Sequence, residues 1–207
     1  MPRIALRLIV TVLAAAISIT LLTWSLTPSS RTTLRQILPP ERTLLPEVRT
    51  LLLDFPVAVR AGEPERVQLT VEADAQATGG ANVYITDTVI AEARLDLGGM
   101  NVQPAETVSE PLLSNHGVSF FWNVQPVETG RFSGTVWFYL RFIPKDGGPE
   151  RRQTISAQAI EIESVTLFGI HPEPARWLGM ASAFIASLFG TPFVVDALKW
   201  LWKPGKN

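Results

Sequence analysis

Two long runs without a charged residue, one near each end of the chain, limit the fold more than any other feature of the sequence. They extend from Leu8 to Leu26 and from Trp177 to Val195, 19 residues each. An α-helix of this length, at about 1.5 Å per residue, nearly crosses the roughly 30 Å of hydrocarbon in a bilayer. Charged residues make up only 18% of the chain, which also favours a membrane protein. We therefore expect two transmembrane helices with a different kind of structure between them.

The first apolar run has the flanks of a membrane anchor. Arg3 and Arg7 precede it, and Trp24 lies near its far end, where an interfacial aromatic residue is expected. A cleaved signal peptide is the alternative, but its apolar part usually has only about 7–15 residues, and no A-x-A cleavage motif follows here. We predict an uncleaved signal anchor over residues 1–26.

The second run belongs to residues 169–207 and admits two interpretations. Either it spans the membrane, or it inserts shallowly as far as Gly190 and then continues along the interface as an amphipathic helix. Pro192 is expected to kink the helix or to end it after Thr191, because proline lacks a backbone N–H. We prefer a spanning helix with a basic tail. One face carries small residues, which allow another helix to approach closely, namely Gly179, Ala183, Ala186 and Gly190.

Lysine and arginine residues near the two runs predict the orientation. If both helices span, five of these residues flank the outer ends on one side and four lie on the other, which is a weak bias. A short, basic N-terminal region usually stays in the cytoplasm. We therefore expect the protein in the cytoplasmic (inner) membrane, with membrane lipid around its helices and its middle region on the extracytoplasmic side.

The segment of residues 27–47 contains four prolines, which disfavour a long helix and stiffen the backbone. We predict a proline-rich stalk here, with a short helix around Thr33 to Leu38. Its leucine and isoleucine side chains are too apolar for a solvated linker, so we expect them to pack on the following domain or on the membrane surface.

From Val48 onwards the apolar residues recur with a period of two, which is typical of β-strands with one buried face. Pro56 suggests an edge strand, and a change of phase near Ala159 suggests a bulge. Six or seven short strands and no long helix predict an antiparallel, immunoglobulin-like β-sandwich over residues 48–168. The fold class is thus mostly β, with a sandwich flanked by N-terminal and C-terminal transmembrane helices.

The stretch FFWNVQPVETGRFSGTVWFYLRFIPKDGGPERR, residues 120–152, carries a resemblance to a known type of domain. With the strand before it and the apolar tail after it, it resembles the immunoglobulin-like sandwich of uncharacterised bacterial membrane-anchored proteins and, more broadly, of bacterial aerotolerance-type membrane proteins. The motifs that recur are W-x-V-x-P, a later glycine and a long aromatic strand. The resemblance implies a fold and membrane attachment, and it implies no catalytic residue.

One predicted strand, Phe132 to Pro144, is apolar on both faces, which raises the question of what covers its second face. Trp137, Tyr139 and Arg141 alternate on that face. Three covers are open: the stalk folding back, a protein partner or second copy, or the membrane surface. Aromatic residues beside an arginine are typical of protein interfaces. We therefore predict Trp137, Tyr139 and Arg141 as partner-binding residues.

The sequence offers little sign of catalysis, metal binding or a cofactor. There is no cysteine, and neither His116 nor His171 lies in a metal-binding or catalytic spacing. The acidic residues Asp87, Glu92, Asp96 and Glu128 lack the clustered spacing of calcium loops. Arg151 and Arg152 are suited to an anionic partner, although two charges are a weak signal. The net charge of −1 argues against nucleic acid.

These observations predict a non-enzymatic, membrane-anchored accessory or scaffold protein without a cofactor. Its partner would be another membrane or extracytoplasmic protein, or a second copy of this chain. The alternative is an extracytoplasmic module that binds a small molecule or glycan between residues 77–82 and the two similar NVQP loops, residues 101–107 and 123–129.

Overall fold

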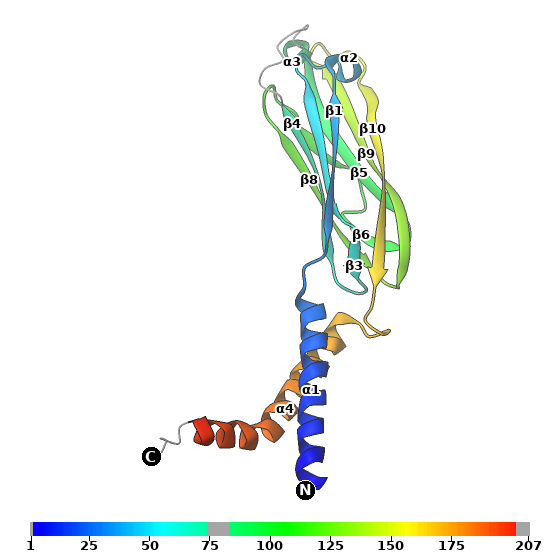
Figure 1. Ribbon diagram of the computed structural model, residues 1–207. Helices are drawn as coiled ribbons and strands as arrows, with labels where there is room; N and C mark the ends of the chain where they lie inside the picture. The colour runs from blue at the N-terminus through cyan, green and yellow to red at the C-terminus, as the bar shows by residue number, and fades with distance from the viewer. Residues whose placement is uncertain (1, 74–82, 202–207) are drawn as a thin grey trace. The chain divides into compact units, whose positions relative to one another are not determined.

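The computed structural model describes the backbone of residues 2–73 and 83–201, and the side chains of residues 9–73 and 83–188. The chain divides into two compact units (Figure 1). Ser29–Val165 form the first, and the two terminal segments, Met1–Pro28 and Thr166–Asn207, form the second.

The central unit is a sandwich of two five-stranded sheets, as predicted (Figure 1). Sheet A has the strand order β1 (Arg31–Leu38), β2 (Arg49–Pro56), β4 (Glu65–Ala73), β8 (Val118–Pro126) and β6 (Met100–Gln103). Sheet B has the order β3 (Ala58–Arg60), β10 (Arg151–Val165), β9 (Gly130–Pro144), β5 (Asp87–Leu97) and β7 (Val108–Pro111). The described strand pairs are antiparallel except β3 with β10. Two one-turn helices, α2 (Pro40–Thr43) and α3 (Val83–Thr86), lie in the connections.

Alternating apolar side chains from both sheets fill the core. Leu51 and Leu53 of β2 lie inward, as do the side chains of Trp122 on β8 and Phe138 on β9, and all are nearly inaccessible to solvent. Phe120 lies 6.4 Å from Trp122 and 6.5 Å from Phe138, measured between ring centroids. Each buried large apolar side chain contributes about 1.5–3 kcal/mol relative to exposure.

The predicted stalk helix is wrong, because residues 31–38 form a strand of sheet A. β1 pairs with β2 along its whole length, from Arg31 opposite Pro56 to Leu38 opposite Arg49. Leu38 is fully buried in the core. The sandwich therefore begins before Val48, and the helix in this segment is α2, which starts at the second of two adjacent prolines.

Two details of the predicted strands also need correction. β2 is not an edge strand, because it pairs with β1 on one side and β4 on the other, and Pro56 stands only at its end. The irregularity in β10 lies between Thr154 and Ser156 rather than near Ala159. It places both Ile155 and Ser156 in buried positions, so the phase of the strand changes earlier than predicted.

The terminal unit contains two long helices, α1 (Pro2–Leu26) and α4 (Pro172–Leu201), which pack against each other. The Ser18 hydroxyl donates a hydrogen bond to the carbonyl of Gly179, at 2.9 Å. A Cβ at Gly179 would lie only 2.9 Å from Leu22 Cγ, so this glycine permits the close approach. Of the predicted small-residue face, Gly179 is buried against α1, Ala183 is exposed, and the surroundings of Gly190 lie outside the described side chains.

The C-terminal helix does not end at Pro192 but continues to Leu201, and Figure 1 shows it as a bent helix. Among the described residues, α1 is the helix long and apolar enough to cross a membrane: Ile9–Leu26 has a mean hydropathy of 2.1 and is only 17% buried. A signal sequence would have the same length and composition. That α4 spans a membrane stays a prediction.

Candidate partner-binding face

The outer face of sheet B carries the residues that the sequence singles out. β9 is the central strand of this sheet, and its even-numbered residues, such as Phe138 and Leu140, are buried in the core. Trp137, Tyr139 and Arg141 alternate with them and lie half-buried on the outside. The predicted division of this strand into two faces is thus confirmed, while a binding role for the outer residues stays a prediction.

The two aromatic side chains form a stack that an arginine extends. The ring centroids of Trp137 and Tyr139 are 6.3 Å apart and their planes differ by 11°. The guanidinium carbon of Arg152, on β10, lies 4.0 Å from the centroid of the Tyr139 ring. A cation over an aromatic face is attracted by the ring quadrupole, so Arg152 holds Tyr139 in place.

A buried carboxylate connects this stack to Arg141. Glu92, on β5, is only 6% exposed although it lies on the outer face. Its Oε2 accepts a hydrogen bond from Arg152 Nε at 2.7 Å, and its Oε1 forms an ion pair with Arg141 Nε at 2.8 Å. The strand register explains the meeting, because Glu92 is opposite Tyr139 and Arg141 is opposite Arg152.

On β10, the residues opposite this stack have small side chains. Thr154 lies opposite Tyr139 and Ala157 lies opposite Trp137, and both are exposed. At these two positions β10 therefore places no large side chain against the Trp137–Tyr139 stack. We call Trp137, Tyr139, Arg141, Arg152 and Glu92 the β9 face.

The segment predicted to cover this face does not do so. Leu38 and Leu45 belong to the core, whereas Ile37 is 60% exposed and Leu44 is 51% exposed. The segment contacts sheet B at the β10 edge instead, where the Gln36 side chain accepts a hydrogen bond from Ser156 at 2.6 Å. The cover seen on the β9 face comes from the arginines of the sheet itself.

A second polar cluster, which the sequence analysis missed, is buried inside the sandwich. Arg49 is fully buried and forms an ion pair with the carboxylate of Glu47, and it donates to the backbone carbonyls of Leu113 (2.9 Å) and His116. The Tyr84 hydroxyl donates to Glu47 at 2.6 Å. Burial, with a smaller effect from this hydrogen bond, raises the pKa of Tyr84 well above its ordinary value.

This cluster ties separate segments of the sandwich together. Its ion pair is inaccessible to solvent, and Arg49 ties residues 113–116 to the start of β2. A buried arginine that serves two carbonyls and a carboxylate satisfies groups that would otherwise be costly to bury. The sequence offered little sign of this cluster beyond the position of Glu47 and Arg49 at the start of the first predicted strand.

The titratable residues considered for catalysis or metal binding are dispersed. His116 is exposed in a turn, with Nδ1 2.9 Å from the Ser114 carbonyl, and His171 is exposed just before α4. Asp96 pairs with Arg94 at 2.7 Å. Within residues 9–73 and 83–188, no three His, Cys, Asp or Glu side chains are grouped so as to hold a metal ion. Part of the alternative ligand pocket, residues 77–82, lies outside the described residues.

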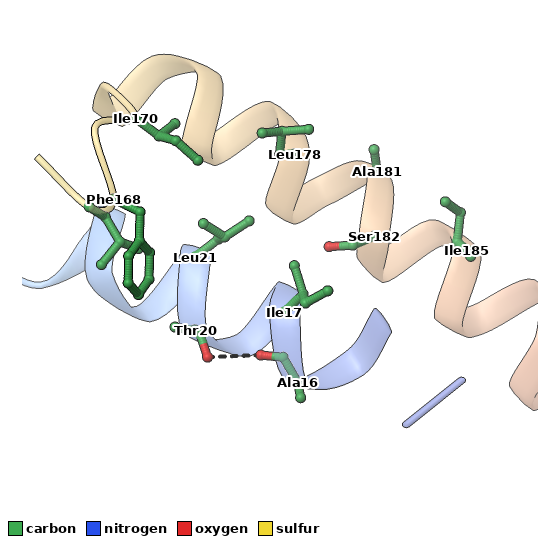
Figure 2. Close-up of a pocket in the computed structure, with 11 residues that line it drawn as sticks. Ala16, Ile17, Thr20, Leu21, Phe168, Ile170, Leu178, Ala181, Ser182 and Ile185 are labelled. Atoms are coloured by element: carbon green, nitrogen blue, oxygen red, sulfur yellow. Dashed lines mark hydrogen bonds between the residues drawn. The ribbon is translucent and has the colours of Figure 1, made fainter. Parts of the chain in front are cut away.

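The terminal unit contains an apolar hollow of about 540 Å³ between α1 and α4 (Figure 2). Ile17 and Leu21 of α1 face Leu178 and Ile185 of α4 across it, and Phe168 lies at one end. The hydroxyl groups in its lining form hydrogen bonds to backbone carbonyls of their own helices. Thr20 donates to the Ala16 carbonyl at 2.9 Å, and Ser182 donates to the Gly179 carbonyl at 3.0 Å. The lining therefore suits hydrocarbon and offers little to a polar ligand.

The comparisons with known proteins concern the fold alone. No protein-family model and no curated protein matches the sequence. Solved structures with a similar arrangement include the CARDB domain of a Pyrococcus furiosus protein, at 10% identity and a TM-score of 0.36, covering 67% of this chain and 96% of that one. Another is AggA, the major subunit of an Escherichia coli aggregative adherence fimbria, at 14% identity and a TM-score of 0.30, covering 67% and 95%. These neighbours are β-sandwich domains, and their low similarity carries no functional argument.

Proposed function

We propose that the protein is a membrane-anchored, non-enzymatic accessory or scaffold protein that binds a protein partner through the β9 face. The observation that carries this proposal is the stack of Trp137, Tyr139 and Arg152, which Glu92 orders and which has small, exposed residues opposite it on β10. Tryptophan, tyrosine and arginine are the residues that contribute most often to binding energy at protein interfaces.

Preorganisation supports a binding role for this face. An interface loses free energy when it must order flexible side chains on association. Here the two arginines are already held by one carboxylate, and the two rings already stack. A partner that docks on the β9 face would therefore meet side chains that need little further ordering.

The anchoring part of the proposal rests on the terminal unit. Many large apolar side chains of α1 and α4 are exposed, for example Ile19 at 66%, Trp177 at 69% and Phe184 at 66%. In water such a surface would be unfavourable, whereas in a bilayer it is solvated by lipid. We place the sandwich on the extracytoplasmic side of the cytoplasmic membrane, because Arg3 and Arg7 lie in α1 just before its apolar part, Ile9–Leu26, and arginines at the end of a membrane span usually mark its cytoplasmic side.

The test is recovery of a stoichiometric partner with the full-length chain in mild detergent. Trp137→Ala should reduce the recovered partner at least tenfold, since loss of an aromatic anchor typically costs about 2 kcal/mol or more. Phe121→Ala is the matched control, because Phe121 is a 46% exposed aromatic residue on the outer face of sheet A. Equal recovery with both variants would exclude the β9 face, and Trp137→Phe should retain the partner if an aromatic ring is what matters.

Reporter fusions after Thr27 and at Gly147 test the membrane side independently of any partner. Both reporters should behave as extracytoplasmic. A cytoplasmic reporter at Gly147 would show that the proposed orientation is wrong.

A further inference from the structure

We propose that the partner presents a carboxylate group to Arg141 and Arg152, and that Glu150 occupies this position in the unbound protein. The inference rests on the proposed function, because it names the chemistry of the partner that the β9 face would bind. The occupant is an extended, acidic segment of another protein.

Both arginines approach Glu92 with their Nε atoms, Arg152 by a hydrogen bond and Arg141 as an ion pair. The distances are 2.8 Å from Arg141 and 2.7 Å from Arg152. The terminal Nη atoms of each planar guanidinium group thus remain for other acceptors, and the two side chains are 31% and 48% exposed. Arg141 and Arg152 carry two positive charges and Glu92 carries one negative charge, so Glu92 alone does not neutralise the pair.

Glu150 shows that this pair of arginines accepts a second carboxylate. It lies on the connection between β9 and β10, with its Oε2 3.3 Å from Arg141 Nη1 and its side chain 53% exposed. An ion pair this exposed is weak and exchanges readily with solvent. A carboxylate from a partner can therefore take the place of Glu150, and the charge balance of the β9 face stays the same.

The spacing along β9 defines what should accompany the carboxylate. Trp137, Tyr139 and Arg141 are two residues apart, so their side chains recur about every 6.6–6.8 Å along the strand. An extended partner segment has the same repeat on one face. Its complementary pattern is an acidic residue, one intervening residue and an apolar residue that packs on the Trp137–Tyr139 stack beside Ala157.

The probe is a labelled peptide of alternating sequence, Glu-Thr-Leu-Thr repeated twice, titrated with the full-length protein in detergent and followed by fluorescence anisotropy. Glutamine replaces glutamate in the control peptide. We expect the glutamate peptide to bind at least tenfold more tightly than the glutamine peptide, with a preference that weakens as salt is raised. Arg141→Gln with Arg152→Gln should abolish the preference, and Glu150→Gln should strengthen binding of the glutamate peptide several-fold.

Arg66→Gln is the matched control variant, because Arg66 lies over Phe121 on the outer face of sheet A and should leave binding unchanged. Equal binding of both peptides, or no effect of Glu150→Gln, would overturn the inference. Vesicles containing phosphatidylglycerol test a second anionic ligand. If the protein binds these vesicles more tightly than the peptide, and does so through Arg141 and Arg152, the site recognises a lipid headgroup instead. If Trp137→Ala loses the partner while the double arginine variant keeps it, the proposed function stands and this inference fails.

Discussion

The two outer faces of the sandwich contain the same kinds of side chain and use them differently. On sheet A, Arg66 lies 5.5 Å from the ring centroid of Phe121, and the residues opposite this pair, Asn123 and Gln68, are polar. On sheet B, Arg152 lies 4.0 Å from Tyr139, which stacks on Trp137. The difference is Glu92, a buried carboxylate that fixes two arginines beside the rings. The carboxylates described near Arg66 are those of Asp54 and Glu65, which are more exposed and pair with Arg31.

This difference shows how a solvent-facing surface becomes an ordered one. Long arginine side chains lose considerable conformational freedom when they are fixed. On sheet B a single buried carboxylate fixes two of them, and their stems in turn shield it from water. The β9 face is therefore preorganised around a buried carboxylate, whereas the ion pair of Arg31 with Asp54 on sheet A is about one third exposed on both sides.

Removing the buried carboxylate should produce the largest effect on this comparison. Glu92→Ala leaves two guanidinium groups without their shared partner, and we expect it to lower the free energy of unfolding by about 2–4 kcal/mol. Asp54→Ala, which removes the partner of Arg31 on the exposed outer side of sheet A, should cost less than about 1 kcal/mol. Chemical denaturation of the full-length protein in detergent, followed by tryptophan fluorescence, measures both. Similar losses for the two variants would show that Glu92 has no special role.

The division of the strands into inner and outer faces was predictable from sequence because it depends on local alternation. The residues of β4, β8 and β9 alternate without interruption, and each strand buries the predicted face. β1 was not predictable in this way. Leu34, Ile37 and Leu38 have the i, i+3, i+4 spacing of a helix, and only pairing with β2 selects the extended conformation.

The candidate site was likewise predictable only in part. Trp137, Tyr139 and Arg141 lie on one strand, so alternation alone brings them together. Glu92 and Arg152 belong to the strands on either side, and their meeting depends on which strands are neighbours and in which register. Pairing register between distant segments is not encoded in the periodicity of either segment, so these two residues became visible only in the folded structure.

An intermediate effect is expected from the arginines that lie over the aromatic rings. Arg152→Ala removes both the cation over Tyr139 and one partner of Glu92, and should cost about 1–2 kcal/mol. Arg66→Ala removes only the more distant contact with Phe121 and should cost about 0.5 kcal/mol or less. Denaturation under the same conditions compares the two. A larger loss for Arg66→Ala would contradict the claim that the β9 face is the better ordered surface.

The variant with the smallest expected effect on stability should still weaken binding clearly. Ala157→Glu places a negative charge in the open space beside Trp137, and Asn123→Glu places one beside Phe121, opposite Arg66. Both positions are exposed, so each change should alter the free energy of unfolding by no more than about 0.5 kcal/mol. Only Ala157→Glu should reduce recovery of the partner, at least fivefold, because the new side chain occupies the approach to the stack and repels an acidic segment. Undiminished recovery with Ala157→Glu would mean that the partner does not approach along β10, and a loss with Asn123→Glu would move the binding surface to sheet A.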